Sequence, residues 1–129
     1  MKLRVLLVED ESLVAMLMED CLVELGYEVA SSVPSVPAAL AALQAGGIDL
    51  AVLDVNLGGT MSFPIADALE ERGIPFVFVT GYGQAGIPRR FHDRSTLQKP
   101  FHIRDLHAAL LHLHAPRFFE RLEAPPKHP

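Results

Sequence analysis

A carboxylate follows directly on an apolar run in the middle of the chain. The run is Leu50–Leu53, the carboxylate is Asp54, and Asn56 lies two residues further on. A short apolar run of this kind predicts a strand of a parallel sheet that is buried on both faces. Open α/β sheets place their ligands at the carboxyl ends of the strands, where Asp54 falls. Alone, Asp54 is most simply interpreted as a cap for the next turn, so its function depends on partners elsewhere in the chain.

Polar side chains also end other predicted strands. Glu9 and Asp10 follow the first strand, Thr80 ends the fourth, and Lys99 follows the fifth. The carboxyl ends of parallel strands open on one edge of the sheet, so these side chains meet there. Three carboxylates in one place raise one another's pKa unless a cation lies among them. Their oxygens suit Mg²⁺, and a hydroxyl and an ammonium group facing them suit a phosphoryl group.

This set of residues predicts phosphoryl transfer to a carboxylate. Asp54 is the nucleophile and forms a mixed acyl phosphate. We expect Mg²⁺ to be held by Asp10, Asp54 and a carbonyl near Asn56, and to neutralise charge on the phosphoryl oxygens. Lys99 does so from the other side, and Thr80 donates its hydroxyl to a phosphoryl oxygen. Little else is required, because positioning and electrostatics supply most of the catalysis of phosphoryl transfer.

Strands alternate with helices along the whole chain, which predicts a doubly wound, five-stranded parallel sheet. The predicted strands are Leu3–Val8, Tyr27–Ser31, Leu50–Leu53, Ile74–Val79 and Thr96–Gln98. The predicted helices are Ser12–Leu25, Ser35–Ala45, Phe63–Arg72, a short one around Pro88–His92, and Ile103–His114.

Local signals set the faces and ends of these helices. We expect the first helix to turn one apolar stripe toward the sheet, made of Val14, Leu17, Met18, Cys21, Leu22 and Leu25. Ser62 is expected to cap the third helix, and Pro116 to limit the last one.

The composition is that of one globular domain. The chain has 129 residues, of which 50% are hydrophobic and 21% charged, and its net charge is −5. Phosphate contacts need a positive surface, so direct nucleic-acid binding is not expected. No apolar run approaches the roughly 18 residues of a membrane span, and no signal peptide is evident. Together with the lone Cys21, which cannot form an internal disulfide, these features predict a cytoplasmic protein without membrane insertion.

Four short motifs resemble the receiver domain of two-component response regulators, over residues 2–115. They are Val5-Leu6-Leu7-Val8-Glu9-Asp10-Glu11, Leu53-Asp54-Val55-Asn56-Leu57, Val79-Thr80-Gly81 and Lys99-Pro100-Phe101. Each motif is weak alone, but the four in this order and spacing are specific. The resemblance implies that Asp54 is the phosphoacceptor and that Glu9 and Asp10 are the acidic metal-binding pair. It also implies that Thr80 is the switch hydroxyl and Lys99 the phosphate-contacting lysine.

The same resemblance implies an architecture. It predicts a flavodoxin-like strand order 2-1-3-4-5 and a cis peptide bond between Lys99 and Pro100. We therefore expect a receiver domain over residues 1–116, followed by a partly frayed C-terminal extension over residues 117–129.

Two positions depart from the family pattern. Receivers usually carry Tyr or Phe three residues before the lysine as an activation switch, and this chain has Thr96 there. The segment from Thr80 to Lys99 is also short, which predicts a shortened fourth helix. Residues Phe78–Gly83 resemble the Phe-Ala-Thr-Gly motif of an atypical subgroup of single-domain receivers from alphaproteobacteria, so Tyr82 is a candidate for the missing switch aromatic.

The sequence therefore predicts a single-domain response regulator. It takes a phosphoryl group from a histidine kinase or a histidine phosphotransfer protein and acts on a separate protein partner, as a monomer or weak dimer. It is not an enzyme, beyond assisting its own phosphorylation and dephosphorylation. One alternative is a pseudo-receiver that binds partners without phosphorylation. Another is a small phosphatase, although such hydrolases need a second Asp at the position of Asn56, and flavin binding is a more distant alternative.

Three further groups of residues have simpler interpretations. The histidines around the last helix, including His107 and His114, are expected on solvated helix surface. Arg89, Arg90 and Arg94 are expected in a solvated turn, with partner binding as the minority hypothesis. We expect the apolar patch of Phe118, Phe119 and Leu122 to pack on the last helix or to form an interface.

Overall fold

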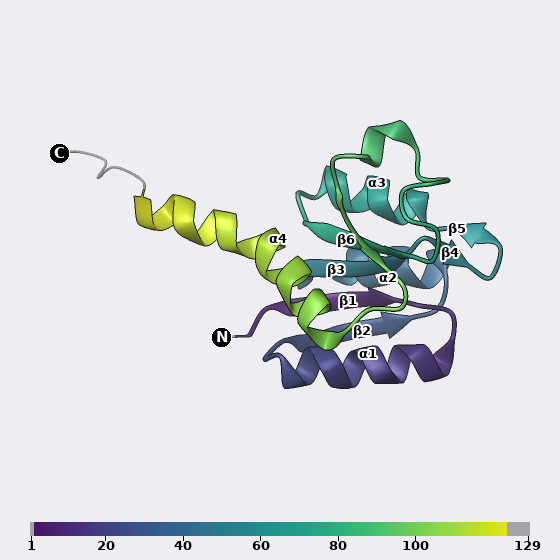
Figure 1. The fold of residues 1–129 in the computed structure, drawn as a ribbon, viewed down its shortest axis with the longest axis horizontal. Helices are drawn as coiled ribbons and strands as arrows, with labels where there is room; N and C mark the ends of the chain where they lie inside the picture. The colour runs from purple at the N-terminus through teal and green to yellow at the C-terminus, as the bar shows by residue number, and fades with distance from the viewer. Residues whose placement is uncertain (1, 124–129) are drawn as a thin grey trace.

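The structure is a computed structural model that describes residues 2–123 and the side chains of residues 2–114. Five parallel strands form one sheet in the order β2-β1-β3-β6-β7 (Figure 1). They are β1 (Arg4–Val8), β2 (Glu28–Val33), β3 (Leu50–Asp54), β6 (Phe76–Thr80) and β7 (Ser95–Gln98). A separate antiparallel hairpin consists of β4 (Asn56–Leu57) and β5 (Thr60–Met61). The helices are α1 (Ser12–Glu24), α2 (Val36–Ala45), α3 (Phe63–Glu71), the 3₁₀ helix η1 (Arg89–Phe91) and α4 (Ile103–Glu123).

The order of the strands confirms the predicted fold. Counted along the chain without the hairpin, the sheet strands lie in the order 2-1-3-4-5, which is the doubly wound, flavodoxin-like arrangement. Successive residues of β1 point to opposite faces: Leu6 and Val8 pack with α2 and α3, whereas Val5 and Leu7 pack with α1 and α4. All residues of β3 and β6 are buried, as their continuous apolar sequences predict.

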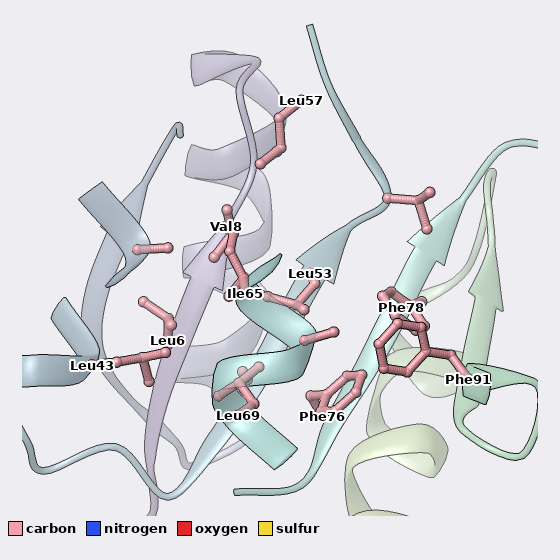
Figure 2. Packing of buried hydrophobic residues seen from close by; sticks show 14 of the residues in the cluster. Leu6, Val8, Leu43, Leu53, Leu57, Ile65, Leu69, Phe76, Phe78 and Phe91 are labelled. Carbon is pink, nitrogen blue, oxygen red and sulfur yellow. The ribbon is translucent and has the colours of Figure 1, made fainter. Parts of the chain in front are cut away.

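Aromatic rings gather in one part of the otherwise aliphatic core on the α3 side of the sheet (Figure 2). Phe78 and Phe91 are fully buried, and their ring centroids lie 5.5 Å apart. Phe76 lies 5.2 Å from Phe78 in an edge-on arrangement, and Phe63 stacks 6.0 Å from Phe91. Because Phe91 belongs to η1, this cluster fixes the position of η1 against β6 and α3.

The segment between β6 and β7 contains only η1 where receivers usually have a full helix, so the predicted shortening is confirmed. Arg90 donates two hydrogen bonds, of 3.3 and 3.2 Å, to the carboxylate of Asp67 on α3. Arg94 forms an ion pair with Glu70, one helical turn further along α3. These two arginines are therefore paired and not merely solvated, although exposed ion pairs contribute little to stability.

The apolar stripe of α1 differs from the prediction at one residue. Met18 and Leu22 are buried as expected, but Leu17 is 59% exposed. Leu13 and Met16 are also exposed on the outer surface of this helix. The helix is apolar on more than one side, so spacing alone did not exclude Leu17 from the side that faces the sheet.

One predicted capping bond and one predicted helix end were wrong. Ser62 is the N-cap residue of α3, but its side chain makes no capping hydrogen bond. Helix α4 was expected to end near His114, and instead its backbone continues past Pro116 to Glu123. Proline removes one backbone donor, and here the helix continues despite that loss. The side chains of Phe118, Phe119 and Leu122 and all of residues 124–129 lie outside the described part, so the boundary after residue 116 stays a prediction.

Among the helices of residues 2–123, none has the length and apolar character that crossing a membrane requires.

Candidate functional site

Three carboxylates meet at the carboxyl edge of the sheet. Glu9 follows β1 and Asp54 ends β3, and the parallel pairing of these strands places Val8 beside Leu53. One oxygen from each of Glu9, Asp10 and Asp54 lies within 4.8 Å of the others. Glu9 and Asp54 are only 3% and 8% exposed, whereas Asp10 is exposed. Like charges at this separation repel one another, so the arrangement is stable only if cations lie close by.

Lys99 supplies one such cation. Its backbone N–H donates to the carbonyl of Thr80, and the peptide bond to Pro100 is cis, as predicted. The Nζ atom lies 3.1 Å from Oδ2 of Asp54 and 3.3 Å from Oε1 of Glu9. Burial acts to lower the pKa of Lys99, but the hydrogen bonds and charges of Asp54 and Glu9 outweigh it, so the pKa is raised. The ammonium group is therefore held in its charged form beside Asp54.

Thr80 ends β6, the strand beside β3 in the sheet, and is 4% exposed. Its Oγ1 accepts a hydrogen bond of 3.0 Å from the backbone N–H of Tyr82. Because the hydroxyl acts as acceptor in this bond, its own proton can be donated to another group. Thr80 and Asp54 line a common hollow of about 220 Å³.

A larger hollow of about 500 Å³ lies over Asp10, Asp54 and Lys99. It is lined by Asp10, Glu11, Asp54, Asn56, Gly58, Gly59, Gly81, Tyr82 and Lys99. The structure thus brings together all six predicted site residues at one edge of the sheet. The lining of the larger hollow is mostly polar, which suits a small, charged, hydrated group.

The aromatic side chain near the site comes from the loop after β6. Tyr82 is 80% exposed and lies at the rim of both hollows. Thr96, at the position of the usual switch aromatic, is in the β7 strand and donates a long hydrogen bond of 3.4 Å to the carbonyl of Arg94. The backbone of Tyr82 is linked to Thr80, whereas its ring lies in solvent.

The hairpin of β4 and β5 is a feature of the site that we did not predict. Gly58 and Gly59 form its two-residue turn, and both have positive φ, of 65° and 99°. A Gly-Gly pair between two short runs is a signal for such a hairpin, so the sequence contained the information. A Cβ atom on Gly58 would lie 3.4 Å from Oδ2 of Asp10, so the turn passes directly beside the acidic cluster.

His114 is half-buried and contacts another side chain, so it fits the predicted solvated helix surface only in part. Its Nε2 lies 2.9 Å from the hydroxyl of Tyr27, and the two rings meet edge-on. Burial lowers the pKa of His114, and the charge of His107 lowers it further. Tyr27 directly precedes β2, so this contact lies at the amino end of the strand, far from the acidic cluster. It connects α4 to the sheet.

Comparison with known proteins identifies the family. Residues 5–111 match the model of the response regulator receiver domain. This match covers most of the chain, so the protein belongs to the receiver domain family of two-component systems. Receivers are signalling domains, and the acidic cluster described above is consistent with the Mg²⁺ site that is typical of them.

Solved structures and a curated relative agree with this assignment. The solution structure of SdrG from Sphingomonas melonis Fr1 is 48% identical, with a TM-score of 0.78, and the match covers 87% of this chain and 96% of SdrG. A CheY-like receiver domain from Methylobacillus flagellatus is 26% identical, with a TM-score of 0.77, over 88% of this chain and 99% of that domain. The transcriptional regulatory protein PdtaR of Mycobacterium tuberculosis is 31% identical over 111 residues. That match covers 83% of this chain but 54% of PdtaR, so the chain spans about half the length of this relative. Membership of the atypical motif subgroup stays a prediction.

Proposed function

We propose that this receiver accepts a phosphoryl group on Asp54 and signals through protein contacts that depend on phosphorylation. The observation that carries the proposal is the position of Lys99, whose ammonium group contacts both Asp54 and Glu9. A lysine in this place neutralises the carboxylate pair at rest and faces a phosphoryl group on Asp54 after transfer. Thr80 supports the same conclusion, because its hydroxyl proton is available on the adjoining strand.

The reaction exchanges one bond to phosphorus for another. A carboxylate oxygen of Asp54 attacks the phosphorus of a phosphohistidine, and the P–N bond breaks with its electron pair remaining on the imidazole. Lys99 then contacts a phosphoryl oxygen in place of the free carboxylate, and Thr80 donates its hydroxyl hydrogen to another. Both groups stabilise negative charge that develops on the phosphoryl oxygens, which is the principal need of this reaction.

The donor set at the site fits Mg²⁺. Asp10 and Asp54 offer carboxylate oxygens, Asn56 offers a backbone carbonyl, and Glu9 adds negative charge behind them. Hard oxygen donors beside an open hollow suit an ion that retains several waters. When bound, Mg²⁺ would neutralise charge on the phosphoryl oxygens.

The outer surface of α1 supports docking of a helical phosphodonor, either a histidine kinase or a histidine phosphotransfer protein. Leu13, Met16 and Leu17 are 68%, 60% and 59% exposed there, close in sequence to Asp10. An apolar groove of about 570 Å³ runs from Leu17 to Ile103 and reaches Lys99. The helix sequence contains three acidic residues and no basic one, so we expect the donor surface to be apolar with basic flanks. We expect this encounter in the cytoplasm, with the receiver as a monomer or weak dimer.

The output of the switch would pass through the loop after β6. The Tyr82 amide is bonded to the Thr80 hydroxyl, so a shift of Thr80 toward a phosphoryl group would pull this loop. The ring of Tyr82 is exposed to solvent and adjoins the smaller hollow. This position supports Tyr82 as the switch aromatic, since the usual position of that aromatic is occupied by Thr96. The partner that responds is a separate protein.

Beryllofluoride, which imitates a phosphoryl group on a carboxylate, tests the proposal. SdrG, which is 47% identical over the matched region, has a solved BeF3-activated conformation. We expect the amide resonances of Thr80, Tyr82 and Lys99 to shift on addition of beryllofluoride with Mg²⁺, and Asp54→Asn to abolish the shifts. An unchanged wild-type spectrum would instead support a pseudo-receiver that works without phosphorylation.

A further inference from the structure

The backbone hydrogen bonds of the hairpin after β3 determine which way its carbonyl groups point. The N–H of Ser62 donates to the carbonyl of Val55, and this bond of 2.9 Å closes the base of the hairpin. Leu57 pairs with Thr60 around the two-residue turn, and Asn56 pairs with Met61 between these two positions. Residues facing each other in antiparallel strands alternate between pairs that exchange hydrogen bonds and pairs that do not. Asn56 is therefore in a pair without hydrogen bonds, and its backbone carbonyl points away from β5.

The direction of that carbonyl matters because the acidic cluster lies beside the hairpin. Asn56 lines the same hollow as Asp10 and Asp54. Gly58, two residues further on, passes so close to Asp10 that a Cβ atom would lie 3.4 Å from Oδ2. The Asn56 carbonyl can act as a metal ligand only while the hairpin keeps this position.

The side chain of Asn56 is occupied inside the hairpin. Its Oδ1 accepts a hydrogen bond of 2.6 Å from the N–H of Gly59, three residues on, and this bond closes a side-chain loop around the first residue of the glycine pair. The two glycines have positive φ and no side chains, so their own packing does little to hold the turn. On the other side, Leu57 is buried in the core and anchors β4. Besides the backbone pairing of β4 with β5, the turn is thus held by one buried leucine and by one side-chain hydrogen bond.

We propose that Asn56 is a positioning residue, whose side chain fixes the glycine turn so that its own backbone carbonyl faces the metal site. This inference rests on the proposed function, since it assigns a role within the Mg²⁺ site. It also means that the Asn56 amide is committed to the turn and does not act on the phosphoryl group. The residue contributes to the reaction through its backbone, and its side chain determines where that backbone lies.

Three substitutions separate this role from the alternatives. Asn56→Ala removes the acceptor for the Gly59 N–H. Asn56→Asp keeps an acceptor oxygen at the same distance from the backbone. Asn56→Gln keeps the amide group but lengthens the side chain, so that its oxygen no longer fits the bond to the Gly59 N–H. An amide acting directly on the phosphoryl group or the metal would be imitated better by glutamine than by aspartate.

Two measurements on the full chain test the proposal. The first is hydrogen exchange of the Gly59 amide without Mg²⁺, which we expect to be slow in wild type and Asn56→Asp and faster in Asn56→Ala and Asn56→Gln. The second is a titration with Mg²⁺ alone, followed by NMR. We expect Asn56→Ala and Asn56→Gln to bind about three- to tenfold more weakly, as the loss of one such hydrogen bond implies, and Asn56→Asp to bind at least as tightly as wild type.

The outcomes are distinct. Wild-type exchange and affinity in Asn56→Ala would overturn the proposal, and so would wild-type affinity in Asn56→Gln together with fast Gly59 exchange. If wild type itself fails to bind Mg²⁺, the proposed function fails and this inference with it. Weakened binding in Asn56→Ala and Asn56→Gln, with unchanged amide positions in the core, supports the positioning role.

Discussion

Lys99 and Asp54 form an ion pair across the carboxyl edge of the sheet, with Nζ 3.1 Å from Oδ2. Asp54 ends β3 and Lys99 follows β7, so the contact spans the width of β6. The side chain of Lys99 is 30% exposed and that of Asp54 10%, which places the pair partly out of water. In the absence of a phosphoryl group and a metal, this pair balances part of the charge of the acidic cluster.

Replacement of Lys99 by methionine removes that charge while keeping much of the side-chain volume. We expect the metal-free protein to lose about 1–3 kcal/mol of unfolding free energy, because Glu9 and Asp54 remain unpaired. We also expect phosphorylation by acetyl phosphate to slow by about 100-fold, as for loss of a charge-stabilising donor. Chemical denaturation and intact mass against time measure the two effects, with Lys99→Arg as the variant that keeps the charge. A phosphorylation rate equal to that of wild type would contradict the role given to Lys99.

Replacement by alanine of two serines at helix starts is expected to have different effects on stability. Ser35 accepts a hydrogen bond from the N–H of Ala38, so Ser35→Ala should destabilise the protein by about 1 kcal/mol. The Ser62 hydroxyl is fully buried without a partner among the described residues, so Ser62→Ala should be neutral or stabilising by up to about 1 kcal/mol. Urea denaturation of both variants compares the two. A clear loss of stability in Ser62→Ala would show that the hydroxyl has a partner, such as a bound water.

His114 makes stability depend on pH in the mildly acidic range. Its pKa lies below the ordinary 6.5, through burial and the charge of His107, so the unfolded chain binds a proton more readily than the folded protein. The stabilising contribution is present above pH 6.5 and is lost as the pH falls through the folded pKa. We expect wild type to lose more unfolding free energy than His114→Gln between pH 7.5 and pH 5. Equal losses in the two proteins would show that the Tyr27–His114 contact does not hold the histidine neutral.

The role of the exposed α1 surface in docking can be tested by comparing the phosphorylation rates with two phosphodonors. We expect Leu17→Glu to slow phosphorylation by a histidine kinase by about tenfold or more, because a charge enters an apolar docking surface. Acetyl phosphate needs no docking, so its rate should be unchanged. Val23 is 57% exposed at the far end of the helix, and Val23→Glu is the matched control. If both donors were affected alike, Leu17 would act on the site and not on docking.

The sequence was sufficient to predict the sheet and the cluster at its edge. Continuous apolar runs identify β1, β3 and β6, and the polar residues after them fix which side chains meet once the strands are parallel. Asp54, Lys99 and Thr80 could be placed together because strand ends in such a sheet share one edge.

Other features depend on tertiary packing or on a choice between near-equal alternatives. The buried side of α1 was ambiguous at Leu17, because the helix is apolar around much of its circumference. Ser62 has a typical capping residue type, yet its side chain is enclosed by the core. A proline such as Pro116 is unfavourable inside a helix but does not exclude one, and α4 continues past it. The hydrogen bond between His114 and Tyr27 joins residues 87 positions apart, which no local pattern indicates.

The central claim is that Asp54 is the phosphoacceptor, and intact mass spectrometry tests it most directly. Wild type and Asp54→Asn are incubated with acetyl phosphate and Mg²⁺, with and without a chelator. We expect one adduct of about 80 Da on wild type only, absent when the chelator is present. An adduct that survives in Asp54→Asn would show that another residue is the nucleophile. No adduct on wild type, with acetyl phosphate or with a panel of histidine kinases, would contradict the account as a whole.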